Sequence, residues 1–390
     1  MAKPLDGVRI ADFSHVMAGP YATHLLCLLG AEVIKIEAPG KGDAMRNYGA
    51  DRRYDGMSPS FIAVNAGKKS IALDLKDPGD CDTARRIVAR SDVLIENFRP
   101  GVMARLGLGY EAVRELNPGI VYCSVSGYGQ SGPLSDWPAI DNIVQATSGM
   151  MSLNGDPGTP PARVGFPVVD TLTGQTAALA ILSALFRRER SGSGDYIDVA
   201  MLDATLGFMA SAVVPYLVTG TALTRTGNTG YSGQPTSALF TARDGRLISL
   251  GVVQQHQFVV LARLLGREDW LADPRFADPD LRRANTADMQ AELGAELRKR
   301  SAEEWETLMS QAGIPCGMVR EVGEAASLPH LAERGARLPL TIPGMPEGCE
   351  NVAIVNAGFR MAQGGPCVDT APPRLDEHHA EILAWLDSEG

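Results

Sequence analysis

The chain has few cysteines for its length, and none of them forms the close pairs that bind zinc. Its 390 residues include six cysteines, no two of which stand in a CxxC spacing. Cysteines dispersed in this way are typical of reduced thiols in a cytoplasmic protein and do not indicate a disulfide framework. The N-terminal segment also lacks the pattern of a secretory signal peptide. We therefore expect a cytoplasmic protein without a metal site.

Runs of basic residues are absent as well. The chain has 36 Lys and Arg against 46 Asp and Glu, which gives a net charge of −10. This balance argues against binding to nucleic acid or to an anionic membrane, although a few well-placed arginines could still hold an anionic ligand. One uncharged stretch, residues 204–224, is long enough to span a bilayer. It contains Pro215, Gly207 and Gly220, so we expect a buried core helix or an interface helix there.

The common nucleotide-binding and hydrolase motifs are also missing. The loop after the first predicted strand reads SHVMAGP, and Gly19 alone does not supply the glycines that let a backbone approach a dinucleotide pyrophosphate. The chain contains no P-loop, no G-x-S-x-G and no HExxH motif. We therefore expect no NAD or FAD, and we interpret His15, His378 and His379 as structural or solvated side chains.

Predicted strands and helices alternate through the first half of the chain, which is typical of an α/β fold. A strand at 8–13, a helix at 18–29 that ends at Gly30 and a strand at 32–37 make one βαβ unit. The alternation predicts a mostly parallel sheet with helices on both faces. The remaining predicted elements of this part are strands at 70–75, 93–96, 120–126 and 196–199 and helices at 83–90, 110–116, 141–151 and 171–188.

The character of the sequence changes after about Arg225, where a glycine-rich segment follows. Asp244-Gly245 is a hairpin signal, and Ser301 with Glu304 forms a capping box before a helix. We expect a smaller α+β domain here, and beyond about residue 337 a Pro- and Gly-rich segment that ends in a helix at 377–386. The expected domains are a large one made of 1–224 and 337–390 and a small one at 225–336. The small domain's predicted elements are strands at 237–241, 247–252 and 314–319 and helices at 256–265, 286–298 and 302–311.

Asp170 stands out because it follows an apolar run and opens a long apolar helix. Aspartate is favoured at helix N-caps, so the pattern predicts that Asp170 caps this helix. A carboxylate in that place is held ionised by the helix dipole, and if it faces a cleft it can act as a nucleophile without a base. Lys35, Arg99 and Arg105 lie near predicted strand ends, where open parallel sheets bind ligands, and arginine suits phosphate groups. Each of them can equally belong to a solvated surface.

Several longer segments resemble those of one protein family, in the family's order and over nearly the full length. They are AGPYATHLLCLLGAEVIKIEAPGKGDAMR, KSIALDLKDPGD, ENFRPGVMARLGLGYE, NPGIVYCSVSGYGQSGP, PAIDNIVQATSGMM, GFPVVDTLTGQTAALAILSAL, GIPCGMVREV and APPRLDEHHAEIL. The run NFRPGV-x-x-RLGLGYE together with SGYGQSGP is highly specific. The chain therefore resembles the family III coenzyme A transferases, which include formyl-CoA transferases and carnitine CoA-transferases.

The resemblance implies a large Rossmann-like domain that binds coenzyme A, a small domain that carries a lid, and a homodimer whose two chains interlock. It also implies that a CoA thioester is a substrate and that no cofactor is bound permanently. The family's catalytic aspartate falls on Asp170. Its CoA contacts fall on Met17, Ala18, Leu73, Asp74, Leu75, Lys76, Asn97, Phe98, Arg99, Arg105, Pro138, Ala139, Ile140 and Asp141.

The implied reaction moves CoA from an acyl-CoA donor to a carboxylic acid through an aspartyl anhydride and an aspartyl-CoA thioester, with the Ala18 N–H as a candidate oxyanion donor. Two departures from formyl-CoA transferases argue against formate and oxalate. Met17 replaces a glutamine, and Gly251 is the only glycine where a glycine run forms the lid. We expect succinyl-CoA as a donor and a larger dicarboxylate or branched acid as acceptor. The candidates for binding its distal carboxylate are Arg46, Arg52, Arg53 and Arg163.

Three other functions fit the sequence less well than CoA transfer. The α-methylacyl-CoA racemases share the fold but place a histidine base where this chain has Ile140, and isoleucine cannot act as a base. A sensor that only binds acyl-CoA would have no need of Asp170. Hydration or dehydration of the acyl group has no acid–base pair in its support. The transferase is therefore the favoured hypothesis, and the racemase is the alternative.

Overall fold

The computed structural model describes residues 2–49, 52–54, 56–368 and 370–388. The chain divides into two compact units. The large unit comprises Met1–Met150, Arg163–Thr221 and Pro329–Gly390, and the small unit comprises Met151–Ala162 and Ala222–Leu328. The sequence placed the two main boundaries at 224/225 and 336/337 and assigned residues 151–162 to the large domain.

The large unit is built on a six-stranded sheet in the order β3-β2-β1-β4-β5-β6. Every neighbouring pair is parallel. In the register of the central strand, Ile10 pairs with Val33 on one side and with Val93 on the other. This strand order is that of the doubly wound Rossmann fold, so the expected fold class is confirmed. The strands are β1 Arg9–Asp12, β2 Glu32–Glu37, β3 Lys69–Ala72, β4 Val93–Glu96, β5 Val121–Ser126 and β6 Asp195–Ala200.

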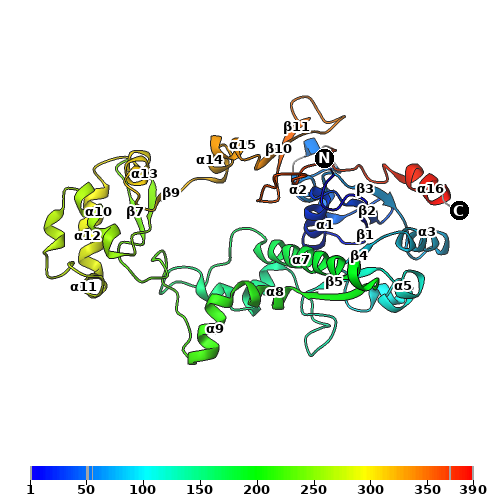
Figure 1. Ribbon diagram of the computed structural model, residues 1–390, viewed down its shortest axis with the longest axis horizontal. Helices are drawn as coiled ribbons and strands as arrows, with labels where there is room; N and C mark the ends of the chain where they lie inside the picture. Colours follow the sequence, from blue (N-terminus) through cyan, green and yellow to red (C-terminus); the bar gives the residue numbers. More distant parts are fainter. Residues whose placement is uncertain (1, 50–51, 55, 369, 389–390) are drawn as a thin grey trace. The chain divides into compact units, whose positions relative to one another are not determined.

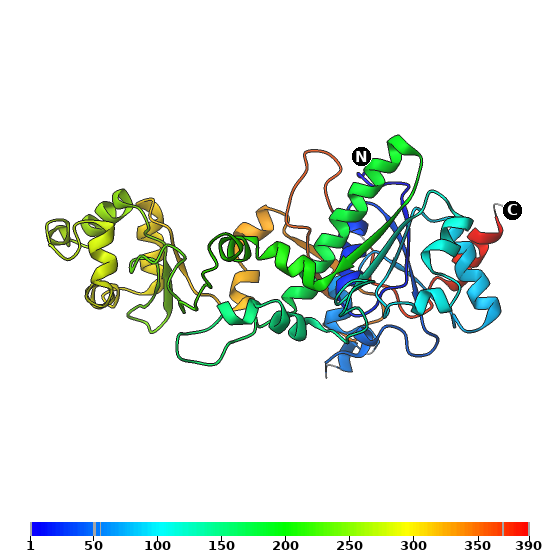
Figure 2. The same cartoon turned by 90° about the horizontal axis from the view of Figure 1, so that it is seen from below.

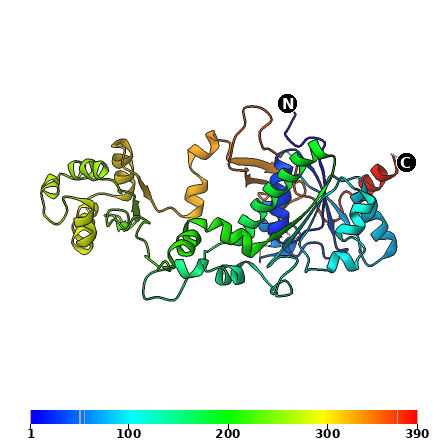
Figure 3. The ribbon, with the colours of Figure 1, turned by 60° about the horizontal axis from the view of Figure 1, so that its bottom comes forward.

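Helices cover both faces of this sheet, as Figures 1 and 3 show. Successive strand residues point to opposite faces, so Ile10 packs under α1 and α7, whereas its neighbour Ala11 packs under α3, α5 and α16. Both faces are apolar, which is why the strands read as continuous hydrophobic runs. The covering helices are α1 Ala18–Leu28, α3 Pro78–Ala89, α5 Tyr110–Leu116, α7 Val168–Ser191 and α16 His379–Asp387.

Local sequence signals explain where most of these helices begin and end. Helix α1 ends just before Gly30, whose φ of 107° suits only glycine. Helix α3 begins five residues earlier than predicted. The Asp77 carboxylate accepts hydrogen bonds from the N–H groups of Gly79 and Asp80, at 2.9 and 3.1 Å, and Pro78 fits the first helical position.

The long apolar segment after β6 is not the single core or interface helix that the sequence predicted. It forms α8, Met201–Phe208, and α9, Ala210–Thr219, whose axes differ by 80°. No residue of α9 is buried within the described chain. By length and composition α7 could also cross a membrane, but 56% of its most apolar window is buried, as in a core helix. Figure 2 shows α7 running beside β6, which is the edge strand of the sheet.

The Pro- and Gly-rich segment beyond residue 337 contains a hairpin that the sequence did not predict. Strands β10, Arg337–Thr341, and β11, Asn351–Val355, pair antiparallel and pack with α2, Pro59–Asn65. Prolines 339 and 343 hid the strand pattern. The other short helices of this unit are α4 Val102–Arg105, α6 Asp141–Thr147 and α15 Pro329–Glu333; the 3₁₀ helices of the chain are η1 Ala44–Asn47, η2 Arg52–Tyr54, η3 Met150–Leu153 and η4 Glu268–Leu271.

The small unit is an α+β structure with its own core. A three-stranded antiparallel sheet in the order β7-β8-β9 packs against helices around Trp270, Phe258 and Trp305. The predicted capping box is present, because Ser301 and Glu304 cap each other at the start of α13. The elements are β7 Leu239–Thr241, β8 Leu247–Leu250, β9 Cys316–Met318, α10 Gln255–Leu264, α11 Pro279–Ala284, α12 Thr286–Leu297, α13 Ala302–Gln311 and α14 Val322–Ala326.

Candidate active site

Asp170 lies in the first turn of α7, three residues after the N-cap. The N-cap residue is Pro167, which supplies no side-chain hydrogen bond. Instead, Oδ2 of Asp141 accepts hydrogen bonds from the backbone N–H groups of Val169 and Asp170, at 2.7 and 3.1 Å. The prediction that Asp170 caps this helix is therefore wrong. A carboxylate from the neighbouring helix α6 does so, and the Asp170 carboxylate is not used for capping.

Asp141 is itself held in place from two directions. Its Oδ1 accepts a hydrogen bond of 2.6 Å from Nε2 of Gln145, one turn further along α6. The amide oxygen of the same Gln145 accepts a hydrogen bond of 2.8 Å from the N–H of Val164, which precedes α7. Asp141 thus joins α6, the segment before α7 and the first turn of α7 into one hydrogen-bonded structure.

The environment of Asp170 changes its acidity. Burial, reinforced by the negative charge of Asp141, raises the pKa of Asp170 from 3.8 to about 7. The expectation of a carboxylate held ionised by the helix dipole is therefore wrong, because burial and the nearby Asp141 charge favour the neutral form. Near pH 7 the carboxyl group titrates, so both its neutral and its nucleophilic form are populated.

This raised pKa predicts a pH-dependent stability effect. Asp170 holds its proton more tightly in the folded state than in the unfolded state, so the neutral carboxyl stabilises the folded state at low pH. This contribution to the free energy of unfolding is lost as the pH rises through about 7. Asp170→Asn should therefore be more stable to urea than the parent protein, with an advantage that grows by roughly 2 kcal/mol between pH 5 and pH 8. The control is Asp82→Asn, which alters an exposed carboxylate on α3. An equal advantage at both pH values would contradict the shifted pKa.

The loop at 14–17, the β1 loop, follows β1 at the point where the strand order reverses between β1 and β4. Its His15 N–H donates to Oδ1 of Asn97 at 2.9 Å, and Nδ2 of Asn97 donates to the carbonyl of His15 at 2.8 Å. Asn97 comes directly after β4, so these two hydrogen bonds join the carboxyl ends of adjacent strands. In open α/β sheets this switch point is where ligands bind.

Val16, in the middle of the β1 loop, has a φ of 66°. This left-handed conformation is rare for a β-branched residue and costs on the order of 1–3 kcal/mol. The N–H of Val16 donates to both carboxylate oxygens of Asp43, at 3.0 and 3.2 Å. A hydrogen bond to a charged group contributes roughly 1.5–3 kcal/mol, which is enough to offset the strain.

Close packing of two helices places the start of α1 beside the first turns of α7. Gly174 lies one turn after Asp170, and a Cβ atom there would come within 2.6 Å of the carbonyl oxygen of Ala18. Only glycine therefore permits this approach. The approach sets the N-terminus of α1, with its unsatisfied N–H groups, next to the helix that carries Asp170.

Buried ion pairs lie beneath the β1 loop. Lys35 is fully buried, and its ammonium group lies 3.0 Å from Asp43. Burial opposes its charge, but Asp12 and Asp43 raise the pKa of Lys35. Burial likewise disfavours the Asp12 carboxylate, yet Lys68 and Lys35 lower the pKa of Asp12 to about 2. The suggestion that Lys35 lies in a ligand crevice is therefore wrong, since it is part of the supporting network.

A cavity of about 910 Å³ opens at the switch point and brings together ten of the fifteen predicted site residues. This volume is within the range of small-molecule sites. The ten are Met17, Ala18, Asn97, Phe98, Arg99, Pro138, Ala139, Ile140, Asp141 and Asp170. The His15 ring also lines the cavity and packs on Phe98 with a centroid distance of 5.2 Å. Burial lowers the pKa of His15, so its imidazole is neutral at pH 7.

The other five predicted contacts do not line this cavity. Leu73 is buried in the core between the sheet and α3, and Leu75 packs against the same cluster. The Asp74 carboxylate accepts a hydrogen bond of 3.0 Å from the N–H of Lys76. Arg105 is exposed at the end of α4. All five follow β3 or β4, beyond the same carboxyl edge of the sheet, where the remainder of a long ligand could extend.

The structure distinguishes among the four arginines that were candidates for binding a distal carboxylate. Arg46 is buried and its guanidinium lies 2.7 Å from Glu37, so it is committed to the supporting network and is not a substrate ligand. The side chain of Arg52 lies outside the described part of the chain, and Arg53 packs over Tyr54. Arg163 lines the cavity together with Asp170.

Sequence reasoning missed the capping role of Asp141 and the role of Asp43. It also missed three exposed aromatic residues that line the cavity, namely Tyr48, Trp137 and Phe166. The run DAM, in which Asp43 caps η1, was a usable signal for Asp43. In the described residues no group of three or more His, Cys, Asp or Glu side chains could hold a metal ion.

Comparisons with known proteins identify the family. Residues 5–379 match the model of CoA-transferase family III. The chain is 42% identical to the acetyl-CoA:oxalate CoA-transferase of Acetobacter aceti, over 97% of this chain and 95% of that protein. It is 35% identical to the succinyl-CoA–D-citramalate CoA-transferase of Chloroflexus aurantiacus, over 98% and 94%. A CAIB/BAIF family protein from Brucella suis has a similar structure, with a TM-score of 0.88, 32% identity and coverage of 99% and 100%. The chain is therefore a CoA-transferase and belongs to CoA-transferase family III.

Proposed function

We propose that this enzyme transfers CoA from an acyl-CoA donor such as succinyl-CoA to a dicarboxylic acid, with Asp170 as the nucleophile. The observation that carries the proposal is the position of Asp170, which lines the cavity at the switch point and is not used for capping. The two relatives named above act on oxalate and D-citramalate, which are both dicarboxylic acids.

The proposed reaction has four substitution steps. The ionised Asp170 oxygen attacks the donor thioester carbonyl, so that a C–O bond forms, the C–S bond breaks and CoA thiolate leaves. The thiolate then attacks the Asp170 carbonyl carbon of this anhydride, which gives an aspartyl-CoA thioester and the free donor acid. The acceptor carboxylate displaces CoA from that thioester to form a second anhydride. The thiolate attacks the acceptor carbonyl and regenerates Asp170.

Residues that line the cavity, together with Arg105 beyond it, are assigned to these steps. Each tetrahedral intermediate carries an oxyanion, and the Ala18 N–H at the start of α1 is the proposed donor to it. Arg99 and Arg105 are proposed to bind the CoA phosphates, because guanidinium groups bind phosphate oxygens in pairs. Met17 and the apolar side chains of Ile140, Trp137 and Phe166 would surround the acyl group.

Arg163 is the proposed partner of the distal carboxylate. We expect Arg163→Gln to raise the KM for a dicarboxylate acceptor by about 10- to 100-fold, because a charge-assisted hydrogen bond is lost. The KM for a monocarboxylate of the same length should not change. Arg99→Gln is the matched control, which should instead raise the KM of every CoA thioester. Equal effects of Arg163→Gln on mono- and dicarboxylates would contradict the assignment.

The size of the acceptor acid can be tested separately from the binding of its distal carboxylate. The side chain of Met17 cannot donate a hydrogen bond to a small polar acid, which favours an acid larger than oxalate. The Acetobacter relative, in contrast, is an oxalate CoA-transferase. Mass spectrometry of products formed from succinyl-CoA with oxalate, glutarate and citramalate in competition should show the larger acyl-CoA products in excess. Exclusive formation of oxalyl-CoA would contradict this choice of acceptor and leave the role of Asp170 standing.

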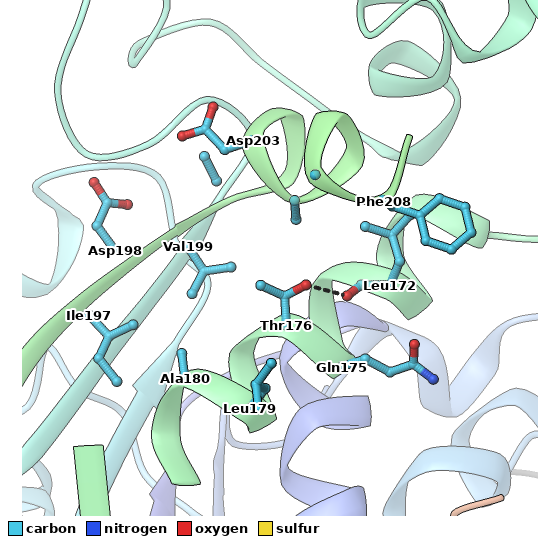
Figure 4. A pocket seen from close by; sticks show the side chains of 13 residues that line it. Leu172, Gln175, Thr176, Leu179, Ala180, Ile197, Asp198, Val199, Asp203 and Phe208 are labelled. Atoms are coloured by element: carbon cyan, nitrogen blue, oxygen red, sulfur yellow. Dashed lines mark hydrogen bonds between the residues drawn. The ribbon is translucent and has the colours of Figure 1, made fainter. Parts of the chain in front are cut away.

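The proposed homodimer is supported by an exposed apolar face on α7, α8 and α9. Figure 4 shows the exposed side chains of Leu179 and Phe208 at a groove that α7, α8 and β6 line. The groove has a volume of about 510 Å³. Leu217 and Val218 on α9 are more than 70% exposed. An apolar surface of this kind is typical of a protein–protein interface, and a second copy that interlocks with the first is the proposed partner.

We expect light scattering after size exclusion to give twice the 41.5 kDa chain mass. Leu217→Glu should lower the dimer fraction at micromolar concentration, because a charge would be buried in the interface. The matched control is Leu116→Glu, which alters an exposed leucine on α5 and should remain dimeric. A monomeric parent protein would contradict the proposed assembly.

A further inference from the structure

The β1 loop is held by three side chains, of which Lys35 and Asp43 do not line the active-site cavity. Three consecutive residues of the loop each have a backbone group whose partner comes from a different segment. The carbonyl of Ser14 accepts a hydrogen bond of 2.7 Å from the Lys35 ammonium group. The next residue, His15, exchanges two hydrogen bonds with Asn97. The N–H of Val16 donates to Asp43. Side chains from outside the loop thus fix its backbone conformation.

Asp43 has the most specific of these roles, because it holds Val16, the residue of this loop with a positive φ. Its carboxylate is almost fully buried, at 1% exposure, and it also accepts a hydrogen bond of 2.9 Å from the N–H of Met45. Lys35 fixes the same carboxylate at 3.0 Å and the Ser14 carbonyl at 2.7 Å. Asp43 and Lys35 together therefore connect β2 and the chain after it to Ser14 and Val16.

The direction of the chain after Val16 matters for the site. Met17 lines the cavity, and the next residue, Ala18, begins α1. Gly174 fixes the position of α1 against α7, as described above, so the remaining freedom lies in the loop that leads into α1. If Val16 relaxed to a negative φ, the peptide planes at Met17 and Ala18 would turn, and their N–H groups would no longer keep their direction relative to Asp170.

We propose that Asp43 is a positioning residue that keeps Val16 left-handed and thereby aims the Met17–Ala18 backbone at the reacting carboxyl group of Asp170. This inference rests on the proposed function. Strained backbone held by its surroundings is a common means of preorganising a site. A displacement of about 1 Å in such a site can cost about 100-fold in rate.

The test is a rescue experiment on the full-length protein. Asp43→Asn replaces the charge-assisted hydrogen bond to the Val16 N–H by a weaker neutral one, which no longer offsets the strain. It should lower kcat for CoA exchange by about 10- to 100-fold and change the KM for acyl-CoA by less than about threefold. Adding Val16→Gly should restore kcat to within about threefold of Val16→Gly alone, because glycine adopts a positive φ without strain. Adding Val16→Ala to Asp43→Asn removes most of the atoms that Val16→Gly removes, but alanine, unlike glycine, is strained at a positive φ. This double variant should therefore remain slow.

The matched glycine and alanine variants separate positioning from a merely structural role. A loss of kcat in Asp43→Asn that glycine and alanine rescue equally, or that neither rescues, would overturn the proposal, and so would a full rate in Asp43→Asn. If Asp43→Asn does not fold, Val16→Pro provides the second test. Proline fixes φ near −65°, so a folded Val16→Pro protein should lose kcat and retain CoA binding. Normal turnover in Val16→Pro would overturn the inference.

Failure of the proposed function would look different. In that case the parent protein would show no exchange, or Asp170→Ala would exchange at the parent rate, whatever residue stands at position 16. The variants at Asp43 and Val16 are informative only in an enzyme whose exchange depends on Asp170.

Discussion

Asp170→Ala is expected to lower the rate of CoA exchange by at least about 10³-fold, because the variant has no oxygen with which to form either covalent intermediate. Its affinity for CoA should stay within about threefold of the parent value, since the other residues of the cavity are unchanged. Exchange is measured by following the acyl group from succinyl-CoA to a labelled acid by mass spectrometry, and binding by calorimetry with CoA.

The matched control for this variant is Asp203→Ala. Asp203 also lies in the first turn of a helix, α8, but it does not line the active-site cavity. Its removal should change the exchange rate by less than about threefold. If Asp203→Ala and Asp170→Ala were equally slow, the effect would reflect damage to this end of the fold and not loss of a nucleophile.

Two variants of Asp141 are expected to separate its charge from its hydrogen bonds. Asp141→Asn keeps an oxygen for the N–H groups of Val169 and Asp170 but removes the negative charge. The pKa of Asp170, raised to about 7 by burial and by that charge, should then fall. Since only ionised Asp170 attacks, the acid limb of the kcat/KM profile should move to lower pH.

Asp141→Ala removes the hydrogen-bond acceptor too. The first turn of α7 then loses its only cap among the described side chains, at a cost of about 0.5–2 kcal/mol in unfolding free energy. We expect kcat to fall by roughly 10- to 100-fold, because Asp170 is less precisely placed. The pH profiles and urea unfolding of both variants test this. An acid limb that stays at the same pH in Asp141→Asn would contradict the electrostatic role.

Much of the fold could be predicted because its signals are local. The strands β2 and β4 and the helix α5 match their predicted bounds, since buried parallel strands are continuous apolar runs between turns. The hairpin of β10 and β11 could not be predicted in this way. Strand β10 contains Pro339, which is unusual in a strand. The two strands also pair through residues that are not neighbours in the sequence, so a local pattern does not reveal the pairing.

The candidate site was predicted in part, and the limit has a physical cause. The family resemblance marked Asp170, and the position of strand ends indicated the edge of the sheet. The protonation of Asp170, however, depends on burial and on Asp141, which is 29 positions away in sequence. The failure of Lys35 and Arg46 as ligand candidates has the same origin, because Asp43 and Glu37 bind them only in the folded chain.

The most direct test of the central claim is to look for the covalent intermediate. The parent enzyme is mixed with succinyl-CoA, quenched in acid within one turnover and digested, and the peptide that contains Asp170 is examined by mass spectrometry. The proposed mechanism predicts that this peptide carries CoA as a thioester on Asp170, and that the adduct disappears when the acceptor acid is added before quenching. Rapid exchange with an unmodified Asp170 peptide, or with CoA on another residue, would contradict it.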